Sequence, residues 1–470
     1  MNNWVGKGET LTKYKGEKSV DNGLIMRVHG FFTRKEFCVF LIYFCDEVMG
    51  SGKTTAAIKA INAAPAEQKF MFVTPYLSEV ARIKEGCAEK EFCEPVEGFD
   101  CKTADLERLI DVQANIVTTH ALFTMMPLEY LEKIRETGYV LFLDETIEPI
   151  EPITLGAELD EEVIYEHYIS VEENGTVQWK GGENYKGYFA WLKKMCDDGC
   201  LKLFRDGNGK PKFLKVLPIL YFEAFKDVII LTYLYSGQIL KCYFEAEKIE
   251  CRRLFLNYEE QMFASEREGV FRRDYRPLIT ILDNPRMNAI GDKKTALSHS
   301  WYARNDLKQV SNNLNNFFKN MMKSPANSRL WTVFADCKEE VGGSRYSKSF
   351  LACNTRATNE YKDRTVLAYL VNRYRNPFFV RYFRYYGVET NNDVFALSEM
   401  LQWLWRSALR DGKHIILYIP SKRMRDLLKA WLGFMAGDVS AGTDDVGEWL
   451  TEQETISEQI FDFEEEDFYE

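Results

Sequence analysis

The sequence predicts an α/β protein with two parallel-sheet units, and three observations support this prediction. Between residue 37 and about residue 155, short apolar runs alternate with helix-forming segments, which is typical of strands joined by helices in a parallel sheet. A loop of small residues ending in Lys53 separates the first apolar run from a helix-forming segment. A second set of apolar runs begins near residue 330. The length of 470 residues agrees with two or three domains of about 150 residues each.

The first unit is expected to span residues 37–240, after a polar lead segment of mixed charge at 1–36. Residues 156–215 contain several glycine-rich turns and depart from the strand-and-helix pattern. We interpret this stretch as an insertion that contains hairpins. The strands expected in this unit are 37–44, 70–73, 115–119, 139–143 and 228–235.

The second unit is expected to span residues 241–436, with helical decoration before its first strand. Asn376 and Pro377 are typical of a helix start, and the aromatic stripe that follows is interpreted as core. The arginines near this stripe are candidates for phosphate contact, and they are Arg375, Arg381 and Arg384. The expected strands lie near 330–335, 365–371 and 414–420, before a helix at 422–432.

Composition excludes some classes of protein. Apolar residues make up 46% and charged residues 28%, as in ordinary globular proteins. No apolar run approaches the roughly 18 residues that span a bilayer, so we expect no membrane partner and a cytoplasmic location. The net charge is −11, yet residues 437–470 hold thirteen acidic residues and no basic ones. We therefore predict a disordered acidic tail on a nearly neutral body, which does not exclude a polyanionic partner.

The loop before the first helix of the first unit has the composition of a phosphate-binding loop. Small residues let backbone N–H groups approach phosphates, and the N-terminus of the next helix offers unpaired donors. Lys53 would reach the β- and γ-phosphates of ATP, and Thr54 would bind Mg²⁺. Glu47 stands where this pattern usually has Gly or Ala. The expected nucleotide-binding residues are Met49, Gly50, Ser51, Gly52, Lys53, Thr54 and Thr55.

Two acidic residues complete the expected nucleotide site. Asp144 and Glu145 end an apolar strand 91 residues after Lys53. An Asp at a strand tip beside the loop would hold Mg²⁺ together with Thr54, and the adjacent Glu would polarise an attacking water. These residues predict an ATP hydrolase.

Further segments fall into a known order. Phe72–Tyr76, Ile116–Leu122 and Cys353–Asn359 resemble nucleic-acid-contacting motifs of superfamily 2 helicases, and Leu231–Leu234 resembles their coupling motif. Over residues 40–435 the chain most resembles DEAD/DEAH-box-like helicases encoded by tailed bacteriophages and prophages. The resemblance implies two RecA-like lobes that hydrolyse ATP with Mg²⁺ to move along or unwind nucleic acid. It assigns nucleic-acid contact to Thr74, Pro75, Thr119, His120, Asn354, Thr355 and Arg356, coupling to Thr232, and catalytic roles to Gln402, Arg406 and Arg410.

The sequence departs from the pattern of this family at several positions. Thr146 follows Asp144-Glu145 where the family has Ala, and Trp405 replaces the usual Gly. Arg406 and Arg410 lie four residues apart instead of three, so either could be the arginine finger. If Gln402 and these arginines shared one helix, all three would project from nearly one side.

These features leave alternatives open. The expected partner is single-stranded or forked DNA, in phage replication or recombination in the host cytoplasm. Replication or recombination proteins could bind the acidic tail or the 156–215 insertion. One alternative is a phage DNA-packaging motor ATPase; another is a nonhydrolytic nucleic-acid-binding or loading factor on a helicase scaffold.

Overall fold

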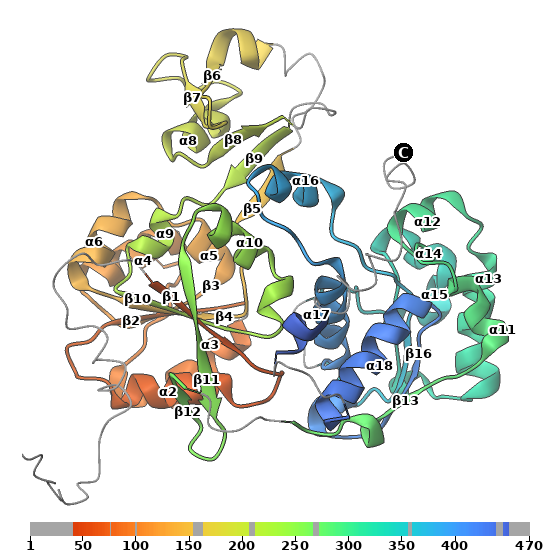
Figure 1. The fold of residues 1–470 in the computed structure, drawn as a ribbon. Coiled ribbons are helices and arrows are strands. Elements are labelled where there is room, and N and C mark those ends of the chain that lie inside the picture. Colours follow the sequence, from red (N-terminus) through yellow and green to blue (C-terminus); the bar gives the residue numbers. More distant parts are fainter. Residues whose placement is uncertain are drawn as a thin grey trace, which may run out of the picture. The chain divides into compact units, whose positions relative to one another are not determined.

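A seven-stranded and a four-stranded sheet, both built mainly from parallel strands, organise this mixed α/β protein (Figure 1). Two smaller antiparallel sheets accompany them. The lead segment expected at 1–36 lies outside the described part. The computed structural model describes residues 41–75, 77–98, 101–153, 163–205, 212–266, 272–355, 360–438 and 445–450.

The first sheet has the strand order β12-β11-β1-β10-β4-β2-β3. All neighbouring strands are parallel except β11 and β12, which form an antiparallel pair. The expected parallel α/β sheet is therefore confirmed. Its strands are β1 (Leu41–Asp46), β2 (Phe70–Thr74), β3 (Ile116–Thr119), β4 (Val140–Asp144), β10 (Asp227–Thr232), β11 (Glu250–Asn257) and β12 (Met262–Ala264).

The central strands of this sheet are apolar because the sheet lies inside the unit. All five residues of β2 are buried, and Ile42, Val73 and Ile230 belong to one hydrophobic cluster. Burying such side chains contributes roughly 1.5–3 kcal/mol each. The helices of this unit are α2 (Lys53–Ala63), α3 (Leu77–Gly86), α4 (Lys102–Asp111), α5 (His120–Thr124), α6 (Glu129–Thr137), α9 (Leu220–Glu223) and α10 (Ile239–Ala246).

The first sheet extends beyond residue 240, where the sequence analysis ended the first unit. Strands β11 and β12 belong to this sheet, so the boundary falls after Ala264. Only the C-terminal half of β11 places side chains in the core, and its N-terminal half carries Glu250, Arg252 and Arg253. These charged residues hid the strand from an analysis of apolar runs.

The insertion contains the expected hairpins, although its sheet starts earlier than residue 156. Strand β5 (Ile150–Ile153) pairs with β9 (Lys212–Val216), and β9 pairs with β8 (Leu201–Phe204). Strands β6 (Ile169–Val171) and β7 (Val177–Trp179) form a hairpin. Its turn contains Gly175, which has a φ of 83°, a backbone conformation that favours glycine. An added Cβ would also come 2.8 Å from the Leu203 carbonyl oxygen. A short π-helix (Ile164–Tyr168) and α8 (Ala190–Asp197) complete the insertion.

The second sheet is parallel throughout, with the order β13-β16-β15-β14. Its core includes Trp331, Trp403 and Trp431, all fully buried. Its strands are β13 (Ile279–Ile281), β14 (Arg329–Thr332), β15 (Val366–Tyr369) and β16 (Ile415–Tyr418). The helices around it are α11 (Pro285–Asn288), α12 (His299–Arg304), α13 (Lys308–Asn315), α14 (Lys338–Val341), α15 (Gly343–Tyr346), α17 (Asn392–Leu404) and α18 (Lys422–Ala436).

Helix α16 (Pro377–Tyr385) follows β15 in the chain but packs against the first unit. The Asn376 side chain accepts a hydrogen bond from the Phe378 N–H, which confirms the expected helix start. Phe378 and Tyr382 are buried in the same cluster as the core of the first sheet. Their rings lie 5.7 and 5.2 Å from that of Phe204 in β8, and α16 lies beside β9 in Figure 1. Four residues of the aromatic stripe are core, as predicted, namely Phe378, Phe379, Tyr382 and Phe383, whereas Tyr386 at its end is exposed.

The prediction that all of 437–470 is disordered is wrong for residues 445–450. They form a helical turn in which Val446 and Leu450 are buried. Trp449 packs its ring 5.5 Å from that of Phe434 in α18. The spacing of these apolar residues gives the acidic segment one face to bury. Residues 439–444 and 451–470 lie outside the described part. None of the helices in that part is both long and apolar enough to cross a membrane.

Asp227 provides a test of burial in the first sheet. It is 7% exposed at the start of β10, and burial raises the pKa of its carboxyl to about 7, against the attraction of Lys226. Between pH 4 and 7 the folded chain therefore holds a proton on Asp227 that the unfolded chain releases. The contribution of this carboxyl to the free energy of unfolding falls as the pH rises through this range. We expect Asp227→Asn to raise the free energy of unfolding by about 2 kcal/mol at pH 8 and by much less at pH 4.5. Denaturant titrations at both pH values measure this, and an equal effect at both would contradict it.

Candidate nucleotide site

Five polar residues end neighbouring parallel strands of the first sheet. Asp46, Thr74, Thr119, Asp144 and Thr232 are the last residues of β1, β2, β3, β4 and β10, respectively. The carboxyl ends of parallel strands meet at one edge of a sheet, where ligands bind in open α/β folds. The strand registers pair Asp46 with Thr232 and Thr74 with Thr119. Four residues chosen from the sequence thus lie along one edge, together with Asp46, which the sequence analysis did not select.

The loop between β1 and α2 has the backbone that its glycines allow. Gly50 and Gly52 have φ values of 78° and 103°, in the region that favours glycine. Gly52 caps α2 without any side-chain hydrogen bond, and the first turn of α2 contains no acidic residue. The Ser51 hydroxyl is buried and has no hydrogen-bond partner within the described residues. The loop therefore combines free donor capacity with the positive end of an eleven-residue helix.

Lys53 is folded back into this loop. Its Nζ donates to the Val48 carbonyl oxygen at 3.1 Å and also to the Glu47 carbonyl oxygen. Burial lowers the pKa of Lys53, while negative groups around it, Asp144 among them, oppose that shift. The Lys53 ammonium is therefore held in position by the same loop whose bound phosphates it is expected to contact.

Asp144 and Glu145 lie one strand away from the loop, because β10 separates β4 from β1. Burial, followed by repulsion from Glu145, raises the pKa of Asp144 to about 7, although Lys53 opposes the shift. Glu145 has a φ of 62°, a costly backbone conformation for a residue other than glycine. His120 donates from Nε2 to the Asp144 carbonyl oxygen at 2.8 Å, since a carbonyl can only accept. His120 therefore positions the end of β4.

The second unit reaches this edge through Arg406. The guanidinium of this buried arginine lies 3.7 Å from Glu145, measured from Nη2 to Oε1. The expected helix that would carry Gln402, Arg406 and Arg410 on one side is not observed, because α17 ends at Leu404. Arg406 lies in the turn after it, and Arg410 is exposed in a short 3₁₀ helix. Of the two arginines, Arg406 is the one that contacts the edge.

A buried polar relay joins the same edge to α17. The Thr146 hydroxyl donates to Gln238 Oε1 at 3.2 Å, and Gln238 Nε2 donates to the Ser398 hydroxyl at 2.8 Å. Gln402 Nε2 also approaches Ser398, at 3.4 Å. Thr146, two residues after β4, is thus connected to Gln402 through two residues that were not predicted from the sequence.

The C-terminal turn fastens to the first sheet beside the loop. Arg253 of β11 pairs with the Asp445 carboxylate and donates to the Asp46 carbonyl oxygen at 3.0 Å. Asp445 also accepts from the Gly447 N–H at 2.8 Å, which caps the turn. An added Cβ on Gly447 would come 2.1 Å from the Ser236 hydroxyl. We call residues 445–450 the C-terminal clasp.

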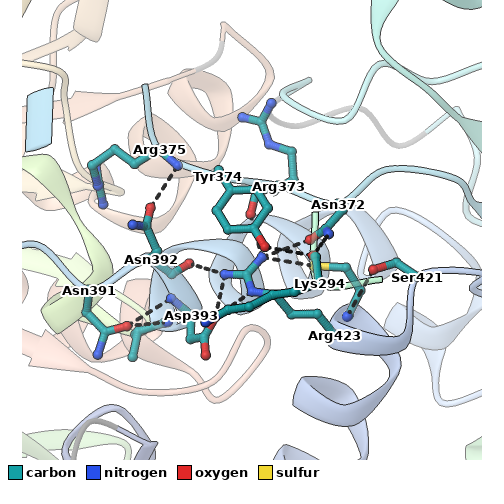
Figure 2. Close-up of polar contacts among 12 residues, drawn as sticks. Lys294, Asn372, Arg373, Tyr374, Arg375, Asn391, Asn392, Asp393, Ser421 and Arg423 are labelled. Carbon is teal, nitrogen blue, oxygen red and sulfur yellow. Dashed lines mark hydrogen bonds and ion pairs between the residues drawn. The ribbon is translucent and has the colours of Figure 1, made fainter. Parts of the chain in front are cut away.

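Arg423 of α18 fixes the start of α17 (Figure 2). It donates to the Asp393 carboxylate at 2.6 Å, to the Asn372 side chain at 2.9 Å, and to the carbonyl oxygens of Arg373 and Asn392 at 2.7 and 3.0 Å. Its guanidinium also lies 4.2 Å from the Tyr374 ring centroid. This network orients the helix that carries Ser398 and leads to Arg406.

Comparison with known proteins places the chain in a family. Residues 273–432 match the family described as the YonV C-terminal Rossmann-like domain, and they contain the second sheet with α17 and all but the last residues of α18. Over 405 residues the chain is 38% identical to the SPbeta prophage-derived uncharacterized protein YonV of Bacillus subtilis (strain 168). The alignment covers 82% of this chain and 97% of that protein. The chain belongs to the YonV family. The prophage origin of the relative supports the phage and prophage association expected from the sequence.

In this YonV-family chain, not all of the predicted site residues come together. The loop residues Met49–Thr55, with Thr74, Thr119, His120, Asp144, Glu145 and Thr232, lie at or next to the strand tips. Pro75 directly follows β2, and Gln402 is connected through the relay. Asn354 is exposed and Thr355 is half-buried, in a turn before β15. Arg356 lies outside the described residues.

Besides Asp46, three contributors to the site were not predicted from the sequence. Gln238 and Ser398 lie within largely apolar segments, and polar residues in such segments can signal a buried hydrogen bond. Arg253 carries no such signal, because its partner Asp445 lies 192 residues away. Arg375, a predicted phosphate contact, is instead buried, and it donates to the Gly237 carbonyl oxygen. Among the described residues, no cluster of His, Cys, Asp and Glu could hold a metal ion alone.

Gln238→Ala tests the relay. The change leaves the buried Thr146 and Ser398 hydroxyls without this partner, and we expect the free energy of unfolding to fall by roughly 1–3 kcal/mol. Gln178→Ala, in an exposed pair with Glu172, is the matched control and should change it by less than about 0.5 kcal/mol. Urea titrations followed by tryptophan fluorescence measure both values. Equal effects for the two variants would contradict the relay.

Asp445→Ala tests the clasp. It removes the partner of a mostly buried arginine and the cap of the turn, so we expect a loss of about 2 kcal/mol in the free energy of unfolding. Asp438→Ala breaks an exposed pair with Arg276 and should cost less than about 1 kcal/mol. Thermal unfolding of the two variants against the parent chain compares these losses. A fully native melting temperature for Asp445→Ala would show that the clasp does not contribute.

Proposed function

We propose that this YonV-family protein is an ATP- and Mg²⁺-dependent nucleic-acid helicase or translocase of superfamily 2, with its two sheets as RecA-like lobes. The observation that carries the proposal is a convergence at one sheet edge. A loop with Lys53 and the Asp144-Glu145 strand tip lie on either side of β10, and Arg406 of the second unit contacts Glu145. Phosphoryl transfer from ATP needs these groups, because charge develops on the phosphates during the reaction.

The loop fits a nucleotide phosphate. The positive φ of Gly50 and Gly52 leaves their backbone open, and the buried Ser51 hydroxyl has donor capacity to spare. Thr54, at the start of α2, and Asp144, at the end of β4, are the residues that would hold Mg²⁺. The bound ion would neutralise charge on the β- and γ-phosphates.

Residues of the chain must rearrange for this reaction. Lys53 has to exchange the carbonyl oxygens of Glu47 and Val48 for phosphate oxygens. Asp144, with a pKa of about 7, has to lose its proton before it can bind a cation, so the site favours neutral or higher pH. Glu145 is the proposed residue that orients the attacking water, and Arg406 is the proposed arginine finger, because Arg406 rather than Arg410 reaches Glu145.

The proposed polymer is single-stranded or forked DNA, in phage replication or recombination within the host cytoplasm. Thr74, Pro75, Thr119 and His120 are the proposed contacts from the first unit, and they lie at or just after the tips of β2 and β3. The relay from Thr146 to Gln402 and the end of β10 at Thr232 would couple nucleotide state to the second unit. The proposed protein partners are replication or recombination proteins, bound by the 156–215 insertion or by the acidic C-terminal residues.

One observation favours a second candidate, a nonhydrolytic nucleic-acid-binding factor on the same scaffold. Glu47, in the place of the usual Gly or Ala, is buried, and its carboxylate accepts a hydrogen bond from the Tyr258 hydroxyl. With the Lys53 contacts, this bond could hold the loop in a form that binds nucleotide without turnover. Phosphate release with and without single-stranded DNA separates the two candidates.

Lys53→Ala is the decisive variant for the enzyme. We expect it to lower DNA-stimulated ATP hydrolysis by about 100-fold or more, because it removes the cation that stabilises the transferred phosphate. Lys59→Ala is the matched control on the same helix; Lys59 is exposed and donates to the Glu260 carbonyl oxygen. A coupled phosphate-release assay measures both. Hydrolysis by Lys53→Ala at the parent rate would overturn the proposed function.

A further inference from the structure

Where the insertion meets α16, aromatic and basic side chains gather around Phe204. The centroid of the Phe204 ring lies 5.6 Å from that of the Tyr385 ring. Phe204 also pairs with Lys212 in the register of β8 and β9. Tyr386 lies 5.2 Å from Tyr385, centroid to centroid. Arg384 precedes these tyrosines at the end of α16. We call Lys212, Arg384, Tyr385 and Tyr386 the α16 junction.

The two tyrosines differ from the rest of the aromatic stripe. Phe378, Tyr382 and Phe383 are buried in the core, whereas Tyr385 is 67% exposed and Tyr386 is 37% exposed. The core therefore does not account for these last two rings. Tyr385 meets the Phe204 and Tyr386 rings nearly at right angles, and Tyr386 is tilted against Tyr382, so in these contacts neither tyrosine is stacked face to face on another ring.

The charge around these rings is mainly positive. Lys212 is exposed, and its ammonium lies 5.5 Å from the Phe378 ring centroid. Arg384 is exposed and lies 3.8 Å from Glu389. Arg205 directly follows Phe204 at the end of β8. Among the described residues, Glu389 lies beside Arg384, and Glu247, which is 3.6 Å from Lys202, acts electrostatically on Tyr386.

We propose that the α16 junction binds single-stranded nucleic acid, with bases on Tyr385 and Tyr386 and phosphates on Lys212 and Arg384. Exposed aromatic rings beside cations are how sequence-independent single-strand sites are built. Paired bases are stacked on their neighbours and cannot present their faces to these rings, so a duplex fits less well. The inference rests on the proposed function for the class of partner, but it uses none of the strand-tip residues.

The position of the junction gives the binding a consequence. Strands β8 and β9 belong to the insertion, while α16 leads directly to the segment before α17. A nucleic-acid strand bound at the junction would contact both the insertion and α16. Helix α16 leads in turn to α17, the helix that carries Ser398 and Gln402. The insertion would then act as a second grip on the polymer, away from the strand-tip edge.

The test measures binding of a fluorescein-labelled oligo-dT of about 20 nucleotides to the full chain without nucleotide. We expect Tyr385→Ala to weaken affinity at least fivefold and to leave its salt dependence unchanged, since the change removes stacking and no charge. Lys212→Gln should instead lower the slope of log affinity against log salt by about 0.7, the value for one single-strand phosphate contact. Tyr385→Phe retains the ring and should restore affinity.

Tyr188→Ala is the control for the junction, because Tyr188 is 76% exposed elsewhere on the insertion. Parent-like binding by Tyr385→Ala and Lys212→Gln would overturn the proposed nucleic-acid binding at the junction. The proposed function would still stand if Lys53→Ala loses ATP hydrolysis as expected. No binding of oligo-dT by the parent chain would overturn the junction outright. Equal losses in Tyr188→Ala and Tyr385→Ala would also overturn it, by showing that any exposed tyrosine suffices.

Discussion

The parallel pairing of β1 between β10 and β11 is the constraint on which the candidate site depends. This pairing places β1, the strand before the candidate phosphate loop, inside the sheet and aligns its carboxyl end with the tips of β10 and β4. Parallel strands need long crossovers, so the residues that meet at this edge are far apart in the chain. Once the strand order is set, Lys53 and Asp144 are neighbours across a single strand, and the pKa of each responds to the charge of the other.

Contacts between the two units are made by buried polar groups rather than by apolar surface alone. Arg406 with Glu145, Gln238 with Ser398, and Arg375 with the Gly237 carbonyl oxygen each join one unit to the other. Such groups are costly to bury unless they are paired, so they favour one relative arrangement over nearby ones. Any movement of the second unit away from this edge would therefore have to break these contacts.

Much of this architecture follows from local sequence, and the exceptions have physical causes. The apolar runs predicted β1, β2, β3, β4, β10 and the last three strands of the second sheet, because these strands are buried on both faces. Strand β11 escaped notice because Arg252 and Arg253 interrupt its half-buried edge. The strand-tip residues could be chosen from motif and spacing. The roles of Arg253, Gln238 and Ser398 could not, because each depends on a partner far away in the chain.

The clasp also bears on the order in which the chain is completed during synthesis. Asp445 lies nearly four hundred residues after Asp46, yet both meet at Arg253. A nascent chain can build the first sheet before this segment leaves the ribosome, but the guanidinium of Arg253 then lacks its carboxylate. The end of β1, and the loop that follows it, is therefore fully braced only once residues 445–450 have been made and have reached Arg253. A long-range contact therefore completes this edge of the candidate site late, after the strands of both sheets have been synthesised.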